Sequence, residues 1–209
     1  MEPNAAEENL QVIRTLMERS ALYRRALAPV MLTAGLLGLN GALAGHRLQL
    51  TSLGAFVGFW FVIAAVTILA SLLIVRRQAL SSAEPFWTPP TRRVTRAMLP
   101  PLVAGLLVTL CWLKAGDAKL NPGGLVLIWC LLHGCALHSA GLFSSRGVRT
   151  LGWGFIVAAI LLGYLQIAYA SQSNLFWLRP HAVMGLTFGG LHGLAGIYLY
   201  FTEKRGNAQ

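Results

Sequence analysis

Residues 53–75 read LGAFVGFWFVIAAVTILASLLIV and contain no charged side chain. A helix needs about 20 mostly apolar residues to cross the roughly 30 Å of hydrocarbon in a bilayer, so this stretch predicts a transmembrane helix. Five other stretches predict the same. The six expected spans are residues 27–44, 53–75, 98–113, 123–143, 148–170 and 182–201. We therefore expect an all-α, polytopic membrane protein whose residues 27–201 form a six-helix transmembrane bundle.

The composition also indicates a membrane protein. Of the 209 residues 56% are hydrophobic and 11% are charged, whereas about 25% are charged in soluble domains. The formal net charge of +10 would also suit a nucleic-acid-binding protein. No basic recognition helix or zinc pattern accompanies that charge, so we expect no nucleic-acid partner.

Positive charge alternates between the two sides of the expected spans. Thirteen of the 17 Lys and Arg residues fall in the N-terminal tail, the second and fourth connections and the C-terminal tail. The other four are Arg47, Lys114, Lys119 and Arg179. Because loops on the cytoplasmic side of a membrane carry an excess of Lys and Arg, we expect both termini to be cytoplasmic.

The two tails are short. Within the N-terminal segment 1–26, residues 5–26 predict an amphipathic helix on the cytoplasmic membrane surface, because Leu10, Ile13 and Met17 recur at helical spacing. A frayed polar segment is the alternative. The C-terminal tail covers residues 202–209.

The connection 76–97 is the longest one expected on the cytoplasmic side. It holds five arginines and a tryptophan suited to the lipid headgroup layer: Arg76, Arg77, Trp87, Arg92, Arg93 and Arg96. Each basic residue near anionic lipid contributes about 1 kcal/mol, so we expect this connection to lie on anionic phospholipids. A docking site for a partner protein is the alternative. Pro89 and Pro90 favour an extended stretch, and Pro100 and Pro101 are expected in the first turn of the third span.

Three histidines inside the expected spans are the candidate ligand-binding residues. His133 and His192 each lie about ten residues from the outer end of their span, so they share a depth near the midplane. Facing imidazoles could ligate a haem iron or a metal, or hydrogen-bond a quinone. Alternatively, each ring bonds a backbone group across a helix contact. His138 is five residues from His133, about 140° around the helix, so the two cannot face one partner.

Small residues recur along the sixth span at Gly185, Gly189, Gly193 and Gly196. Glycines at this spacing let a neighbouring helix approach closely. We expect them to serve packing within the bundle, with a homo-oligomer contact as the alternative.

The usual signs of enzymes and of ion-driven carriers are missing from the sequence. No Asp or Glu lies in an expected span, and no nucleotide loop, serine hydrolase elbow or H-E-x-x-H motif occurs. We expect a protein without catalytic activity, with a structural or regulatory role exercised through lipid or a partner subunit. The alternatives are a membrane redox subunit that binds haem, a metal or a quinone, and a facilitator for a neutral small solute.

Three segments of the chain resemble a group of small six-span bacterial membrane proteins. They are YRRALAP (23–29), AEPFWTPPTRR (83–93) and GLHGLAGIYLYF (190–201). The resemblance implies a location in the cytoplasmic (inner) membrane of a bacterium and attaches no activity to the chain.

Overall fold

The described part of the chain consists of helices joined by short turns and connections. The computed structural model describes residues 27–81, 87–115, 122–169 and 179–206. Six of its helices are long and apolar enough to cross a membrane, as the apolar stretches predict. The amphipathic helix predicted in residues 1–26 lies outside the described residues, as does the end of the C-terminal tail.

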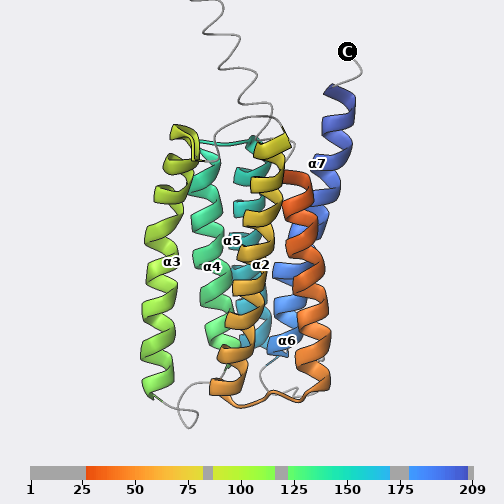
Figure 1. The fold of residues 1–209 in the computed structure, drawn as a ribbon. Helices are drawn as coiled ribbons and strands as arrows, with labels where there is room; N and C mark the ends of the chain where they lie inside the picture. The colour runs from red at the N-terminus through yellow and green to blue at the C-terminus, as the bar shows by residue number, and fades with distance from the viewer. Residues whose placement is uncertain (1–26, 82–86, 116–121, 170–178, 207–209) are drawn as a thin grey trace, which may run out of the picture.

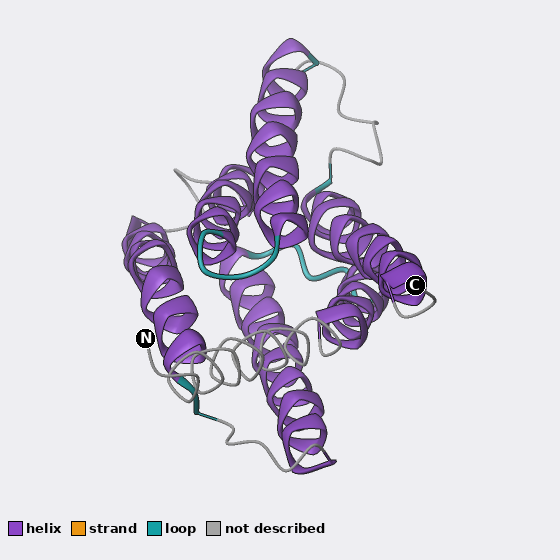
Figure 2. Cartoon of the chain, turned by 90° about the horizontal axis from the view of Figure 1, so that it is seen from above, coloured by secondary structure: helices purple, strands orange, loops and turns teal. Residues whose placement is uncertain are grey.

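The six long helices run alternately up and down the bundle (Figure 1). They are the first helix Leu27–Arg47, α2 Leu53–Ser81, α3 Pro89–Ala115, α4 Pro122–Gly141, α5 Arg146–Ala168 and a sixth helix made of three segments. These segments are α6 Pro180–Met184, the π-helical η2 Gly185–Leu191 and α7 His192–Gly206. The start of the first helix and the end of α7 lie at the same end of the bundle (Figure 1). Seen from above, several helices are tilted against the others (Figure 2).

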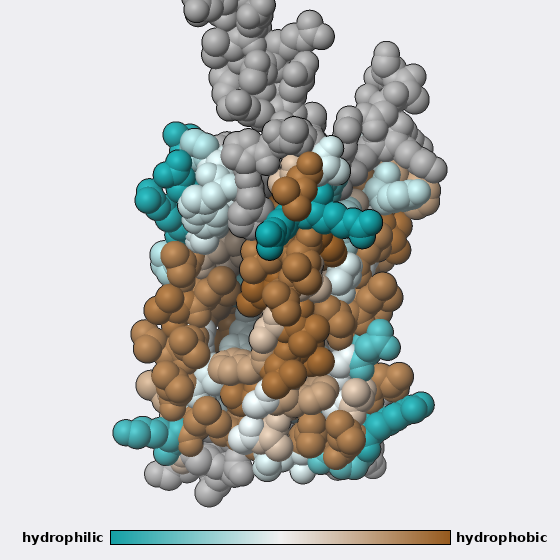
Figure 3. Space-filling model, viewed as in Figure 1, coloured by the Kyte–Doolittle hydropathy of each residue, from teal (hydrophilic) through white to brown (hydrophobic). Residues whose placement is uncertain are grey.

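A broad apolar surface covers the bundle between two more polar ends (Figure 3). Large apolar side chains face outward on it, for example Ile167 at 81% exposure and Leu194 at 66%. Exposed apolar area of this extent is unfavourable in water and favourable in hydrocarbon. The exterior therefore fits a multi-pass membrane protein.

The two helices that flank the connection 76–97 extend far into it. α2 continues to Ser81, and α3 begins at Pro89. The prediction that Pro89 and Pro90 form an extended stretch is therefore wrong, because both lie in the first helical turn. Proline suits this place, since its φ matches the helix and its missing N–H has no helical partner there. The side-chain oxygen of Thr88 accepts a hydrogen bond from a backbone N–H of the same turn at 3.5 Å.

Because α3 begins so early, Pro100 and Pro101 lie inside it. The prediction that they belong to a first turn is also wrong. A proline inside a helix removes the hydrogen bond to the carbonyl four residues earlier. The carbonyl oxygens of Arg96 and Ala97 therefore lose their helical donors, and α3 is weaker at this level.

Glycines bring the sixth helix close to the first helix. A Cβ on Gly38 would lie 2.8 Å from Gly189 Cα, and a Cβ on Gly35 would lie 2.6 Å from the backbone nitrogen of Gly193. Three of the four glycines predicted for packing face the first helix with their own Cβ directions: Gly185, Gly189 and Gly196. Gly193 differs, because a Cβ there would meet nothing within 4 Å. Gly193 contributes to the contact through its backbone nitrogen and Cα, which face Gly35.

Candidate ligand site at a buried histidine pair

Two histidines meet in the middle of the bundle, one from α4 and one from the start of α7. His133 Nε2 and His192 Nε2 are 3.4 Å apart. His192 is 7% exposed and His133 is half-buried. Their equal distance from the span ends predicts a common depth, and the structure brings the two rings into contact.

The π-helical segment η2 orients the His192 ring. The backbone N–H of His192 bonds the carbonyl of Gly189, and the Phe188 carbonyl lies 2.8 Å from His192 Nδ1. A carbonyl oxygen can only accept, so Nδ1 carries the proton and Nε2 of the neutral ring is an acceptor. Short π-helical segments inside longer helices occur frequently at functional sites.

The tautomer of His192 sets that of His133. Since His192 Nε2 accepts, the contact between the rings is a hydrogen bond only when His133 Nε2 donates. His133 Nδ1 is then an acceptor, and no group in the described part of the chain bonds it. The fully buried side-chain atoms that lack a partner there are His138 Nδ1 and Gln166 Nε2. His133 Nδ1 is not one of them, so it keeps accessible surface.

Aromatic rings pack around the pair. The ring centroid of Phe155 lies 4.9 Å from that of His133 and 5.1 Å from that of His192. The ring centroid of Phe188 lies 5.0 Å from that of His133. Phe155 is fully buried, whereas Phe188 also lines the cavity beside the pair. The two imidazoles therefore sit in apolar surroundings and share their cavity wall with an aromatic ring.

A cavity of about 370 Å³ adjoins the histidine pair. Its wall comes from the first helix, α2, α3, α4 and the sixth helix, and most of its side chains are apolar. The polar side chains of the wall other than the two histidines are Trp60, Thr67, Thr109 and Trp129. Figure 3 shows a hollow at mid-height between α3 and α2. The cavity therefore lies at the level of the lipid hydrocarbon.

The two hydroxyl groups of the wall are already used inside the protein. Thr67 and Thr109 each donate to the carbonyl four residues earlier in their own helix, at 2.7 Å. Thr109 Oγ1 also accepts from Trp129 Nε1 at 2.8 Å. These bonds remove three donor hydrogens from the cavity.

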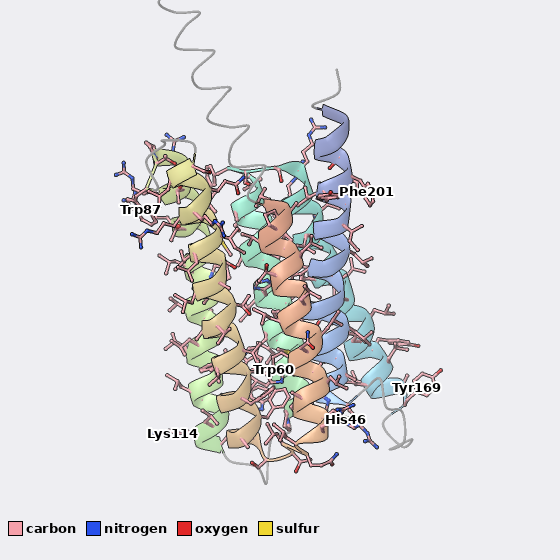
Figure 4. All side chains as sticks on the ribbon, turned by 45° about the vertical axis from the view of Figure 1, so that its right-hand side comes forward. His46, Trp60, Trp87, Lys114, Tyr169 and Phe201 are labelled. Atoms are coloured by element: carbon pink, nitrogen blue, oxygen red, sulfur yellow. The ribbon has the colours of Figure 1, made fainter. Side chains whose placement is uncertain are left out.

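Trp60 belongs to a second buried hydrogen-bond chain. Its Nε1 donates to His181 Nδ1 at 3.2 Å, and His181 Nε2 lies 3.0 Å from the Leu50 carbonyl. Because Nδ1 accepts, Nε2 carries the proton and donates to that carbonyl. Figure 4 shows Trp60 within the lower half of the bundle. The chain ties the segment after the first helix to the start of the sixth helix.

His138 does not join the pair. Its ring packs edge-on against Trp153 with a centroid distance of 5.3 Å, and it does not line the cavity. Its backbone nitrogen lies 2.5 Å from where a Cβ on Gly152 would be, so this face of α4 packs on α5. The angular separation of His133 and His138 explains why only one of them reaches His192.

The arginines of the connection 76–97 gather at one end of the bundle and are exposed. With two arginines at the start of α5 they form what we call the basic rim: Arg76, Arg77, Arg92, Arg93, Arg96, Arg146 and Arg149. Trp87 lies at the same end and is 54% exposed (Figure 4). The described Lys and Arg side chains at the opposite end are Arg47, Lys114 and Arg179.

Several cavity residues escape detection from the sequence. Phe188 lies four residues before His192 and so on the same helical face, which could have indicated it. Trp60 and Trp129 come from other helices, and no spacing in the sequence links them to the histidines. No protein-family model, curated protein or solved structure matches the chain. Function therefore has to be argued from the site itself.

Proposed function

We propose that this protein binds a lipid-soluble small molecule in the cavity beside His133 and His192 and catalyses no reaction. The observation that carries the proposal is a mainly apolar cavity with one histidine pair in its wall. Small-molecule sites are typically apolar concavities of about 300–1,000 Å³ with a few placed polar groups. At about 370 Å³ this cavity falls within that range. A regulatory role exercised through lipid is consistent with such a site.

The ligand would enter from the bilayer between α2 and α3. Four side chains line the cavity and also face outward, with exposures between 41% and 60%: Phe61, Ile68, Leu102 and Leu106. Side chains that line the cavity and are also exposed on the outer surface form the edge of an opening toward lipid. Pro100 and Pro101 weaken α3 beside this opening. The opening can therefore widen while few helical hydrogen bonds are broken.

A haem or a metal suits the pair less well than an organic ligand. Two nitrogens on opposite sides of one metal, each about 2 Å from it, stand about 4 Å apart, whereas the two Nε2 atoms are 3.4 Å apart. The rings of Phe155 and Phe188 pack against His133, so the space beside the pair is already partly filled. A tetrahedral metal tolerates the shorter distance but needs four ligands. No group of three His, Cys, Asp or Glu that could hold a metal occurs among the described residues.

We test the proposal by filling the cavity. A Cβ on Gly105 would lie 3.6 Å from Leu132 Cδ1, an ordinary contact, and Gly105 lines the cavity. Gly163 offers a matched control, because a Cβ there would lie 3.5 Å from Leu127 Cδ1 and Gly163 is outside the cavity wall.

The two probes are 2-decyl-1,4-benzoquinone and its hydroquinone. For each probe the measurement is the thermal midpoint of unfolding of the purified protein in detergent. A ligand that binds the folded state raises this midpoint. The rise should appear in the wild type and in Gly163→Leu and should vanish in Gly105→Leu. An equal rise in Gly105→Leu, or none in the wild type with either probe, contradicts the proposal.

For the orientation we propose that the basic rim and both termini face the cytoplasm of a bacterium. Residues 1–26 would then form an amphipathic helix on the same side. The support is the uneven charge of the described side chains, with seven arginines at the basic rim and three Lys and Arg residues at the other end, together with the tendency of positive loops to remain inside. In this arrangement the basic rim lies against anionic phospholipids.

Cysteine labelling tests this orientation. In a variant without the natural cysteines, an impermeant maleimide added to intact spheroplasts should modify Ser52→Cys and spare Ser81→Cys. Both serines are exposed at opposite ends of α2. Labelling of Ser81→Cys alone would show the reverse orientation.

A further inference from the structure

We infer that the ligand carries a hydrogen-bond donor on an aromatic head group, as a lipid-soluble hydroquinone or phenol does, and that His133 Nδ1 accepts this hydrogen bond. The inference rests on the proposed function, because it concerns the head group of the molecule in the same cavity. It names the reduced hydroquinone rather than the quinone as the preferred form. It follows from counting the donors and acceptors that the cavity wall presents.

Apart from the histidines, every polar hydrogen on a wall side chain is already donated to a hydrogen bond within the protein. The hydroxyls of Thr67 and Thr109 donate to backbone carbonyls, and the indole of Trp129 donates to Thr109. The indole of Trp60 donates to His181. A quinone carbonyl in the cavity would therefore find no free donor among these side chains, all of which lie in the described part of the chain.

The histidine pair offers the ligand no free donor either, but it does offer one free acceptor. His192 Nδ1–H donates to the Phe188 carbonyl, and His133 Nε2–H donates to His192 Nε2. Both donors of the neutral pair are thus used within the protein. What remains is the lone pair of His133 Nδ1, which accepts no bond from a described residue and keeps accessible surface. A ligand hydroxyl satisfies this nitrogen, whereas a carbonyl oxygen beside it meets a second acceptor.

Cooperativity strengthens this preference. A hydroxyl that donates to His133 Nδ1 extends a chain running through both imidazoles to the Phe188 carbonyl. Successive hydrogen bonds of such a chain polarise one another in a medium of low dielectric constant. The aromatic character of the head group follows from the wall, where Trp60, Phe61, Trp129 and Phe188 offer ring faces and edges.

The experiment compares three molecules of nearly the same shape. They are 2-decylhydroquinone, 2-decyl-1,4-benzoquinone and 1,4-dimethoxy-2-decylbenzene, which keeps the hydroquinone ring and oxygens but has no donor. Binding to the full chain in detergent micelles is measured by isothermal titration calorimetry without oxygen, with protein-free micelles subtracted. A net hydrogen bond in a protein corresponds to about 2- to 13-fold in affinity. We expect the hydroquinone to bind about fivefold more tightly than either of the other two.

Variants locate the effect. His133→Phe should reduce the ratio between hydroquinone and quinone to about one, because His133 Nδ1 is gone and a phenyl ring in the place of the imidazole still covers His192 Nε2. His138→Phe is the matched control on the same helix and should keep the wild-type ratio, since His138 lies outside the cavity wall. If His133→Phe does not fold, the ratio of hydroquinone to quinone affinity measured on the wild type still tests the preference for a donor.

The outcomes separate this inference from the proposed function. Quinone binding as tight as hydroquinone binding, with both lost in Gly105→Leu, overturns the donor preference and keeps the cavity as a ligand site. A wild-type preference that survives in His133→Phe overturns the role of His133. Absence of binding by all three molecules overturns the proposed function together with the inference.

Discussion

Replacing Gly38 with alanine should force the first and sixth helices apart. The added Cβ would lie 2.8 Å from the nitrogen and Cα of Gly189 and 3.0 Å from the Phe188 carbonyl carbon. Carbon atoms in contact are normally about 3.5–4.0 Å apart, so the two backbones must separate by roughly 1 Å at this level. All three atoms belong to the main chain, and no side chain can rotate out of the way.

The expected cost of Gly38→Ala is about 1–3 kcal/mol, the range for extra volume forced into a packed interior. The matched control is Gly58→Ala on α2, where a Cβ would meet nothing within 4 Å. There the substitution should be neutral or slightly stabilising, because alanine favours the helix more than glycine does. Unfolding is followed by tryptophan fluorescence during an SDS titration in mixed micelles, and the difference between the two variants is the quantity of interest.

A Gly38→Ala variant as stable as Gly58→Ala, within about 0.5 kcal/mol, would refute this close contact. The substitution also displaces the backbone at Phe188, whose carbonyl holds the His192 ring. Gly38→Ala should therefore weaken hydroquinone binding, and Gly58→Ala should not. Loss of stability without any loss of binding would show that the helix contact and the histidine pair are independent.

Three further tests probe the polar groups. Trp60→Phe should cost about 1–3 kcal/mol, because it leaves the buried His181 acceptor unpaired; Trp129→Phe should cost less, since its partner hydroxyl keeps another bond. In the same SDS titration, equal costs would contradict this ranking. His192→Phe should be more destabilising than His138→Phe, because only His192 has hydrogen bonds to lose; the opposite order would argue against the assigned pairing. Replacing the three α3 arginines of the basic rim with glutamine should lower the anionic phospholipid that co-purifies, measured by native mass spectrometry, and unchanged lipid content would remove the rim as a lipid site.

The helix count is well predicted because it depends on a local property. Runs of about 20 apolar residues indicate a spanning helix whatever its neighbours are. The boundaries are less predictable. Pro89 and Pro90 suggest an extended segment when considered alone, but they also fit the first turn of a helix that continues to Ala115. Polar residues at the ends of α2 and α3 hide how far these helices extend beyond the apolar run.

The candidate site was only half predictable. Depth along a helix can be counted in the sequence, and His133 and His192 emerge from that count as a matched pair. Rotation around the helix cannot be obtained in the same way. A helix in a membrane is apolar on the face toward lipid and on the face toward its neighbours, so the hydrophobic period that orients a soluble helix is weak here.

The sequence by itself thus determined the number of apolar helices and the uneven distribution of positive charge, because both follow from residue type along the chain. Only the tertiary structure decided that His133 faces His192 and that Trp60 and Trp129 line the same cavity. It also decided which atoms of the pair donate, through the Phe188 carbonyl at the π-helical segment. The physical reason is that these features depend on how helices rotate and approach one another. In this chain close approach is set by glycine contacts between helices distant in sequence, such as Gly38 against Gly189.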